Sequence, residues 1–170
     1  DADLSYSIIK MNEPLHSLSI ASQVVWRKDK HQVFFIENLN FIRSPSESYA
    51  NNGFIHVRYQ NPADKRLMSE SFVQVQYNKL LKVMYRQLIG GGGRLQVFSG
   101  EQDKDRAFIG AVLMNEYEII QNREEVNFDL RWSFYAALSI KPWKNLEINS
   151  TTYYQPILGN GSDYRISTEN

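Results

Sequence analysis

Between positions 126 and 140 the residue type alternates with a period of two. Every even-numbered position is apolar, and nearly every odd-numbered position is polar or small. Successive side chains of a β-strand point to opposite faces, whereas a helix would scatter Asp129, Arg131 and Ser133 around its circumference. The stretch therefore predicts one long β-strand with one apolar face and one polar face.

The same alternation recurs along the whole chain of 170 residues, and turn-forming residues separate the stretches. We expect ten strands, at about residues 4–11, 16–26, 31–43, 53–60, 69–78, 84–98, 106–120, 126–140, 146–157 and from 163 onward. No segment shows a competing helical period. The rhythm predicts an all-β fold over residues 1–170: a single domain, built as an antiparallel up-and-down β-barrel of about ten to twelve strands.

Four segments depart from this rhythm. Alternation is poor within 31–43, where a β-bulge would restore the phase. Residues 44–52 are rich in Pro, Ser and Asn and predict a loop. Four glycines, Gly90 to Gly93, lie inside an expected strand, which predicts a sharp bend or a large neighbour lying over the backbone. The last strand is unfinished at Asn170, so we expect further strands or another subunit to close the sheet.

The composition excludes several classes of function. Nineteen basic and nineteen acidic residues cancel, which gives no electrostatic reason to expect nucleic acid binding. Cysteine is absent, which excludes disulfides, a cysteine nucleophile and any cysteine-ligated metal. No apolar run approaches the roughly 18 residues of a membrane-spanning helix. If the chain crosses a membrane, it must do so with strands.

Alternation alone does not say which face of the barrel points inward. In a soluble barrel the apolar face forms the core, and in a membrane barrel it contacts lipid. Three features favour the membrane: many strands of ten or more residues, large side chains on the apolar face, and aromatic residues near strand ends. The aromatic residues in question are Trp26, Tyr59, Tyr77, Tyr117 and Tyr154. The turn lengths do not separate into one short and one long set, which counts against a membrane barrel.

Two segments carry a resemblance to a known family. Residues 72–78 read Phe-Val-Gln-Val-Gln-Tyr-Asn, and residues 86–94 read Arg-Gln-Leu-Ile-Gly-Gly-Gly-Gly-Arg. Together with Tyr-Tyr-Gln-Pro at 153–156 and Asp-Tyr-Arg at 163–165, they resemble a bacterial family of salt-induced outer-membrane proteins, a β-barrel domain of unknown function. The resemblance covers about residues 16–170 and implies a barrel in the bacterial outer membrane. Members of that family continue for further strands and end on an aromatic residue, unlike this chain.

Charged residues on the polar face are balanced in number, so they predict mutual pairing and not charge selection in a pore. We interpret them as a network that lines the lumen and holds the barrel in shape, with a narrow pore or a small polar ligand site as the sharper alternative. The members of this predicted network are Arg58, Arg86, Arg94, Glu116, Glu118, Asp129, Arg131, Glu147, Asp163 and Arg165.

Catalytic motifs are absent from the sequence. His16, His31 and His56 are far apart and lack metal-binding spacing, and no Gly-x-Ser-x-Gly motif is present. We therefore expect no catalysis, no metal and no cofactor. The expected function is a structural or accessory role in an outer-membrane assembly, with the lipid bilayer and other outer-membrane proteins as partners. The alternatives are a soluble lipocalin-like barrel that binds an apolar ligand, and a barrel-embedded lipid or sugar hydrolase.

Overall fold

The computed structural model describes the backbone of residues 2–10, 14–44, 48–100, 105–121, 126–143 and 145–169. Side chains are described for 16–44, 51–100, 105–121, 126–143 and 145–169. Within these ranges the fold is all-β and contains no helix. The strands are β1 (Ala2–Lys10), β2 (Pro14–Lys28), β3 (His31–Arg43), β4 (Ser48–Pro62), β5 (Leu67–Asn78), β6 (Val83–Ser99), β7 (Arg106–Ile120), β8 (Val126–Trp143), β9 (Leu146–Ile157) and β10 (Asn160–Glu169).

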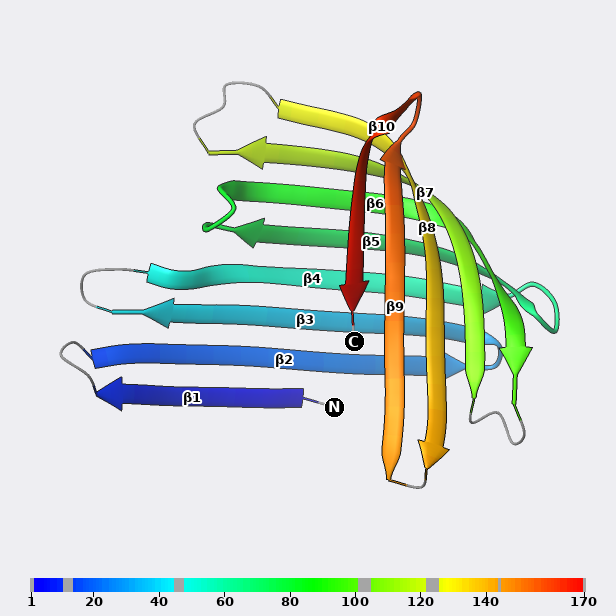
Figure 1. The fold of residues 1–170 in the computed structure, drawn as a ribbon, viewed down its shortest axis with the longest axis horizontal. Coiled ribbons are helices and arrows are strands. Elements are labelled where there is room, and N and C mark those ends of the chain that lie inside the picture. The colour runs from blue at the N-terminus through cyan, green and yellow to red at the C-terminus, as the bar shows by residue number, and fades with distance from the viewer. Residues whose placement is uncertain are drawn as a thin grey trace. The chain divides into compact units, whose positions relative to one another are not determined.

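All ten strands belong to one sheet, in which each strand neighbours the next in chain order (Figure 1). The pairs β1–β2, β2–β3, β8–β9 and β9–β10 are antiparallel, so the chain runs up and down. The predicted all-β class, the antiparallel pairing and the up-and-down order are confirmed.

The predicted closure into a barrel is not seen in the part of the chain that the structure describes. The strand order runs from β1 to β10, and no pairing between these two strands is among the described strand pairs. Residue alternation defines the two faces of each strand, but it carries no information about which edges meet. Closure therefore could not be derived from the pattern that identified the strands.

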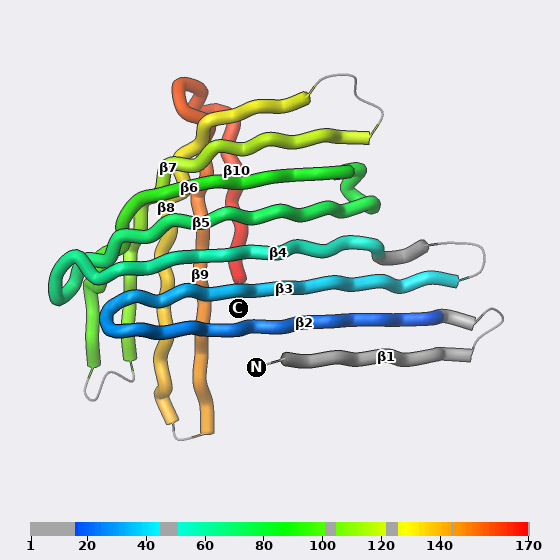
Figure 2. The backbone as a smooth tube through the Cα atoms, turned by 180° about the vertical axis from the view of Figure 1, so that it is seen from behind, coloured from blue at the N-terminus to red at the C-terminus, as the bar shows by residue number. Residues whose placement is uncertain are grey.

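The chain divides into two compact units. Unit 1 consists of Asp1–Tyr59, Phe72–Ile89 and Glu116–Phe128, and unit 2 consists of Gln60–Ser71, Gly90–Asn115 and Asp129–Asn170. In unit 1, β2, β3 and β4 lie side by side (Figure 2). In unit 2, β8, β9 and β10 are neighbours in the same way (Figure 1).

The β2–β3 hairpin shows why the expected bulge is unnecessary. Its register runs without a shift from the pair Lys28–His31 to the pair His16–Arg43. The two-residue turn between the strands places Asp29 at a φ of 53°, a conformation that Asp tolerates better than most residues. The poor alternation of 31–43 therefore reflects apolar residues on both faces of β3, and the predicted bulge is wrong.

The predicted loop over residues 44–52 is also shorter than expected. Residues 45–47 lie outside the described part of the chain, but β4 already begins at Ser48. The Asn51 carbonyl accepts a hydrogen bond of 3.0 Å from the Lys79 backbone N–H. Pairing with a neighbouring strand thus overrides the weak strand preference of Ser and Asn in this segment.

The glycine run in β6 meets a neighbouring backbone, not a large side chain. A Cβ atom added at Gly92 would lie 2.1 Å from the Ala111 carbonyl oxygen of β7 and 2.7 Å from the Val112 Cα atom. Only a residue without a side chain allows the two strands to approach so closely. A large side chain over a glycine does occur in unit 2, at Gly110, where the same construction gives 2.2 Å to the Tyr135 ring.

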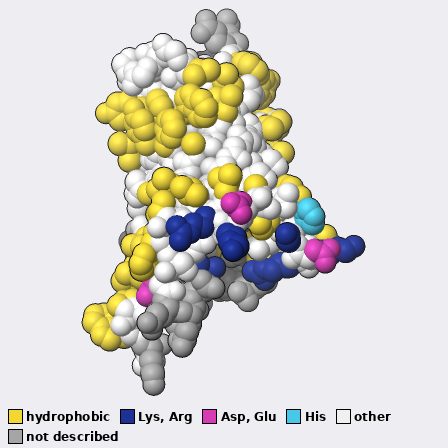
Figure 3. Space-filling model, turned by 90° about the vertical axis from the view of Figure 1, so that its right-hand side faces the viewer, with side chains coloured by type: hydrophobic (Ala, Val, Ile, Leu, Met, Phe, Trp, Pro, Cys, Tyr) yellow, Lys and Arg dark blue, Asp and Glu magenta, His cyan; other side chains and the backbone are white. Residues whose placement is uncertain are grey.

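The two faces of the sheet differ in burial, and the polar side chains are the more buried ones, whereas in a water-soluble protein the apolar side chains are buried. The described side chains that are buried are mostly polar: Ser44, His56, Gln60, Glu70, Glu116, Glu118, Arg131 and Ser133, against four hydrophobic ones, Val83, Val112, Met114 and Tyr135. Apolar side chains on the alternate positions are exposed, and many hydrophobic side chains lie on the surface drawn in Figure 3. The polar face is therefore the buried one.

Candidate functional site

In unit 1, the buried face carries an ion-pair cluster centred on Arg86. Its Nε atom lies 3.0 Å from Glu116 Oε1 and donates a hydrogen bond of 3.1 Å to Glu118 Oε1, and its Nη2 atom also bonds to Glu118. The Glu116 side chain has no exposed surface. Glu116 and Glu118 are two residues apart on β7 and so share a face. Buried carboxylates require such pairing, and these three predicted network residues are brought together.

Arg58 contacts a second polar group in unit 1. Its Nε atom donates to His56 Nε2 at 3.2 Å, and its guanidinium lies 5.9 Å from the centre of the Phe72 ring. His56 Nδ1 and Gln74 Oε1 are 2.8 Å apart. A histidine ring nitrogen can accept a hydrogen bond from arginine only when that nitrogen carries no proton. In this contact His56 Nε2 is the hydrogen-bond acceptor.

In unit 2, Arg131 of β8 contacts two of the predicted network residues. Its guanidinium lies 3.2 Å from Asp129 and 3.2 Å from Asp163, and it donates to the Gln155 carbonyl oxygen at 3.4 Å. The Gln155 side chain in turn donates to Ser133 Oγ at 3.1 Å. The Arg131 side chain is nearly fully buried, so the two aspartates supply the counter-charge that its burial requires.

Two other predicted residues have different surroundings. Glu147 lies near the turn between β8 and β9, where it pairs with Lys141 at 2.7 Å and accepts a hydrogen bond from Asn149 at 3.2 Å. The bond from Lys141, with that from Asn149, lowers the pKa of the Glu147 carboxyl below its ordinary value. The Arg94 guanidinium stacks on the Phe108 ring at 4.3 Å. The described contacts place neither residue in the Arg86 or the Arg131 cluster.

Sequence reasoning missed a buried polar group in unit 2. The Tyr135 hydroxyl donates a hydrogen bond of 2.5 Å to Glu70 Oε1, and Gln60 Nε2 donates one of 3.3 Å to Glu70 Oε2. Tyr135 lies on β8, and Glu70 lies on β5, three strands away in the sheet order. The signal existed in the sequence, because Glu70 lies in the expected strand 69–78 and shares the phase of Gln74 and Gln76 on its polar face, but Glu70 was not included in the predicted network.

The histidines show no arrangement typical of catalysis in their described contacts. His31 Nδ1 lies 2.6 Å from the Tyr59 hydroxyl, with the two rings stacked at 5.8 Å. His56 contacts Gln74 and Arg58. Among the described residues no group of three or more His, Asp or Glu side chains is placed to hold a metal ion. These contacts do not contain the Ser–His pair that the hydrolase alternative requires.

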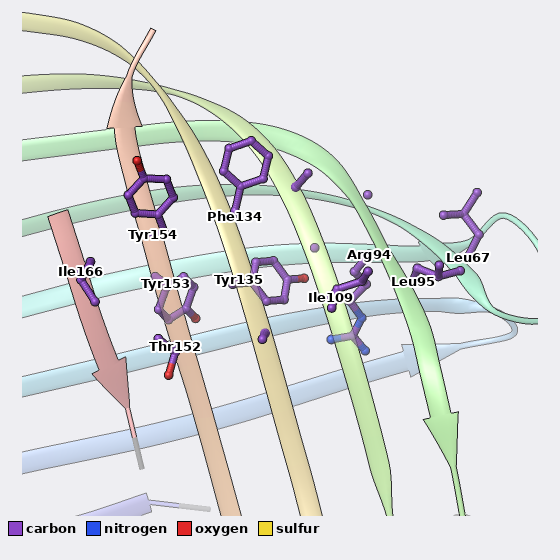
Figure 4. A pocket seen from close by; sticks show the side chains of 14 residues that line it. Leu67, Arg94, Leu95, Ile109, Phe134, Tyr135, Thr152, Tyr153, Tyr154 and Ile166 are labelled. Carbon is purple, nitrogen blue, oxygen red and sulfur yellow. The ribbon is translucent and has the colours of Figure 1, made fainter. Parts of the chain in front are cut away.

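On the apolar face of unit 2 lies an open groove of about 860 Å³ (Figure 4). Its walls include Leu95, Ile109, Phe134, Tyr154 and Ile166, which come from β6 to β10. The floor is low because small residues, Gly93, Ala111 and Ala136, lie between these walls. The groove is thus a depression in an apolar surface, and Arg94 is the one charged residue among the described residues that line it.

None of the described residues forms a helix long and apolar enough to span a membrane. The model of the family described as "Protein of unknown function, DUF481" matches residues 2–170. The chain belongs to this family. The DUF481 match extends the expected resemblance to the beginning of β1 and confirms membership of a family of unknown function. The description of the matched family does not mention salt-induced outer-membrane proteins, so that part of the resemblance is not confirmed. No curated protein and no solved structure matches the chain.

Proposed function

We propose that this DUF481 protein resides in the bacterial outer membrane, with the apolar face of its sheet toward lipid, and has a structural or accessory role in an outer-membrane assembly. The observation that carries the proposal is the reversed burial of the two faces. Phe128 is 70% exposed and Ile166 is 65% exposed, whereas Glu116 is fully buried. In water such a distribution is unfavourable, because each large apolar side chain left exposed forgoes about 1.5–3 kcal/mol of burial energy.

A bilayer makes the same distribution favourable. Strands that cross a membrane place apolar side chains toward lipid and polar side chains toward the lumen. Backbone groups in lipid must also be paired, so the proposal requires both edges of the sheet, β1 and β10, to find partners. The partner strands are each other, further strands, or another outer-membrane protein. Closed barrels of this kind occur in bacterial outer membranes, which is why we choose that membrane.

The polar face supports a structural role more than transport. In the Arg86 and Arg131 clusters each guanidinium pairs with two carboxylates. A selective pore presents an excess of one sign along its path, whereas paired charges fix neighbouring strands to each other. We therefore propose no catalysis and no charge-selective conduction, and we place the function in the stability of the barrel and its contacts within an assembly.

The test is whether the purified chain remains folded and monodisperse without detergent. The proposal predicts that it does so only in detergent or lipid, with β-sheet circular dichroism and with gel mobility that changes on boiling. A sharp gel-filtration peak and a β-sheet spectrum in plain buffer would refute the membrane location. That outcome would favour the alternative of a soluble barrel that binds an apolar ligand.

A further inference from the structure

A second pocket lies in unit 2. It has a volume of about 320 Å³, and its lining includes Arg94 and Phe108, the hydroxyl side chains of Ser139 and Thr151, and Glu169. Thr151 pairs with Ala137 of β8 and with Glu169 of β10, so these three side chains share one rung and one face. Ala137 is small, which leaves the pocket open between the side chains around it.

Arg94 differs from Arg86 and Arg131, the arginines of the two ion-pair clusters, in the partners that it lacks. Its Nε atom donates to the Met68 sulfur at 3.4 Å, and its guanidinium stacks on Phe108. Among the described residues no carboxylate lies within ion-pair distance of it, in contrast to Arg86 and Arg131. Figure 4 shows its side chain reaching from β6 toward β7. Within the described part of the chain, these two contacts hold the guanidinium and leave its terminal nitrogens without a hydrogen-bond partner.

We infer that Arg94 binds the carboxylate of a small organic ligand in this pocket. A planar guanidinium presents parallel N–H donors that match the two oxygens of a carboxylate, and such charge-assisted pairs are among the strongest hydrogen bonds. The pocket is at the lower end of the volumes of small-molecule sites, so the ligand must be small.

The other polar side chains that line the pocket restrict the ligand further. The Glu169 carboxylate repels a second negative charge and accepts hydrogen bonds, and the hydroxyls of Ser139 and Thr151 both donate and accept. A ligand with one carboxylate at one end and hydroxyl or ammonium groups at the other end fits this distribution. The shared chemistry is thus a monocarboxylate with hydrogen-bond donors, which is found both in sugar acids and in amino acids.

The test is isothermal titration calorimetry on the folded full chain, in the medium that keeps it folded. The probes are gluconate for the sugar acids and serine for the amino acids, with acetate as the probe that lacks donors. We expect gluconate or serine to bind more tightly than acetate, and the arm that binds identifies the source. Arg94→Gln is expected to weaken binding at least tenfold because it removes the charge-assisted pair. Arg106→Gln, which changes an exposed arginine of β7, is the matched control and leaves binding unchanged.

A second variant separates binding from folding. Ala137→Leu keeps Arg94 and fills the pocket from its floor, so it is expected to abolish binding while circular dichroism stays at the wild-type level. If neither gluconate nor serine binds the wild-type chain, the inference is wrong. Binding that survives both Arg94→Gln and Ala137→Leu would place the ligand elsewhere and would equally overturn it.

Discussion

Replacing Gly110 by alanine is expected to lower the free energy of unfolding of the protein. Apart from Gly92, no other described glycine of unit 2 is expected to cost as much stability when it is replaced by alanine. The added Cβ atom would lie 2.2 Å from two carbons of the Tyr135 ring and 2.7 Å from its hydroxyl oxygen. Ordinary carbon contacts are about 3.5–4.0 Å, so the ring must move by more than an ångström. That movement removes the hydroxyl from its 2.5 Å hydrogen bond to Glu70.

The expected cost has two parts. Overpacking in a well-packed region costs about 1–3 kcal/mol. A buried polar group that loses its partner costs about 1–3 kcal/mol more, and Glu70 is buried. We therefore expect Gly110→Ala to lower the free energy of unfolding by about 2–6 kcal/mol. This is a large fraction of the 5–15 kcal/mol that typically stabilises a domain.

Urea unfolding followed by circular dichroism, in the medium that keeps the chain folded, measures this loss. Gly91→Ala is the matched control, because its nearest atom, the Glu70 carbonyl oxygen, would be 3.8 Å away. We expect that control to be neutral or slightly stabilising. The double variant Gly110→Ala with Tyr135→Ala removes the clash, and its cost should be smaller than the sum of the two single costs by at least about 1 kcal/mol.

Two results would refute the reasoning. The first is equal stability of Gly110→Ala and Gly91→Ala, which would mean that Tyr135 does not lie over Gly110. The second is strict additivity in the double variant, which would mean that the two residues do not interact.

Three further predictions concern other parts of the chain. Leu130→Arg places a charge on the apolar face and is expected to cost about 2–4 kcal/mol in lipid and to prevent insertion into vesicles, an outcome that normal insertion would contradict. Arg131→Met leaves two partly exposed aspartates unpaired and should lower the free energy of unfolding by about 1.5–3 kcal/mol in urea titrations, so an unchanged midpoint would count against the cluster. The lowered pKa of Glu147 implies that its contribution to stability is present above the ordinary carboxyl pKa and is lost as the pH falls through the lowered value. Lys141→Met should raise the pKa of Glu147 toward its ordinary value in an NMR titration, and an unmoved pKa would exclude Lys141 as the cause.

The strands themselves could be predicted from the sequence because alternation is a local property. The expected strand over 126–140 lies within β8, and Arg131, which shares its polar phase, is buried. The joining of Arg86 to Glu116 and Glu118 required only that β6 and β7 be neighbours, which an up-and-down order supplies. Local pattern and simple topology thus account for most of the architecture.

What the sequence could not supply depends on atomic contacts between strands, both distant and adjacent. Nothing in the neighbourhood of Glu70 or Tyr135 indicates that the two meet across three strand spacings. The reason for the glycines at Gly92 and Gly110 likewise depends on the strand next to each, and only the atomic arrangement gives it. Closure of the sheet belongs to the same class, because it concerns the two strands furthest apart in the chain.

The hydrogen bond between Tyr135 and Glu70 has a consequence for the order of folding. Every strand pairs with its neighbours in sequence, so the sheet can grow one hairpin at a time through contacts of short sequence separation. The Tyr135–Glu70 bond joins residues 65 positions apart and can form only when β5, β6, β7 and β8 are in register. It is therefore expected to form late, after the transition state. Removing the Tyr135 hydroxyl should then accelerate unfolding and leave the folding rate nearly unchanged.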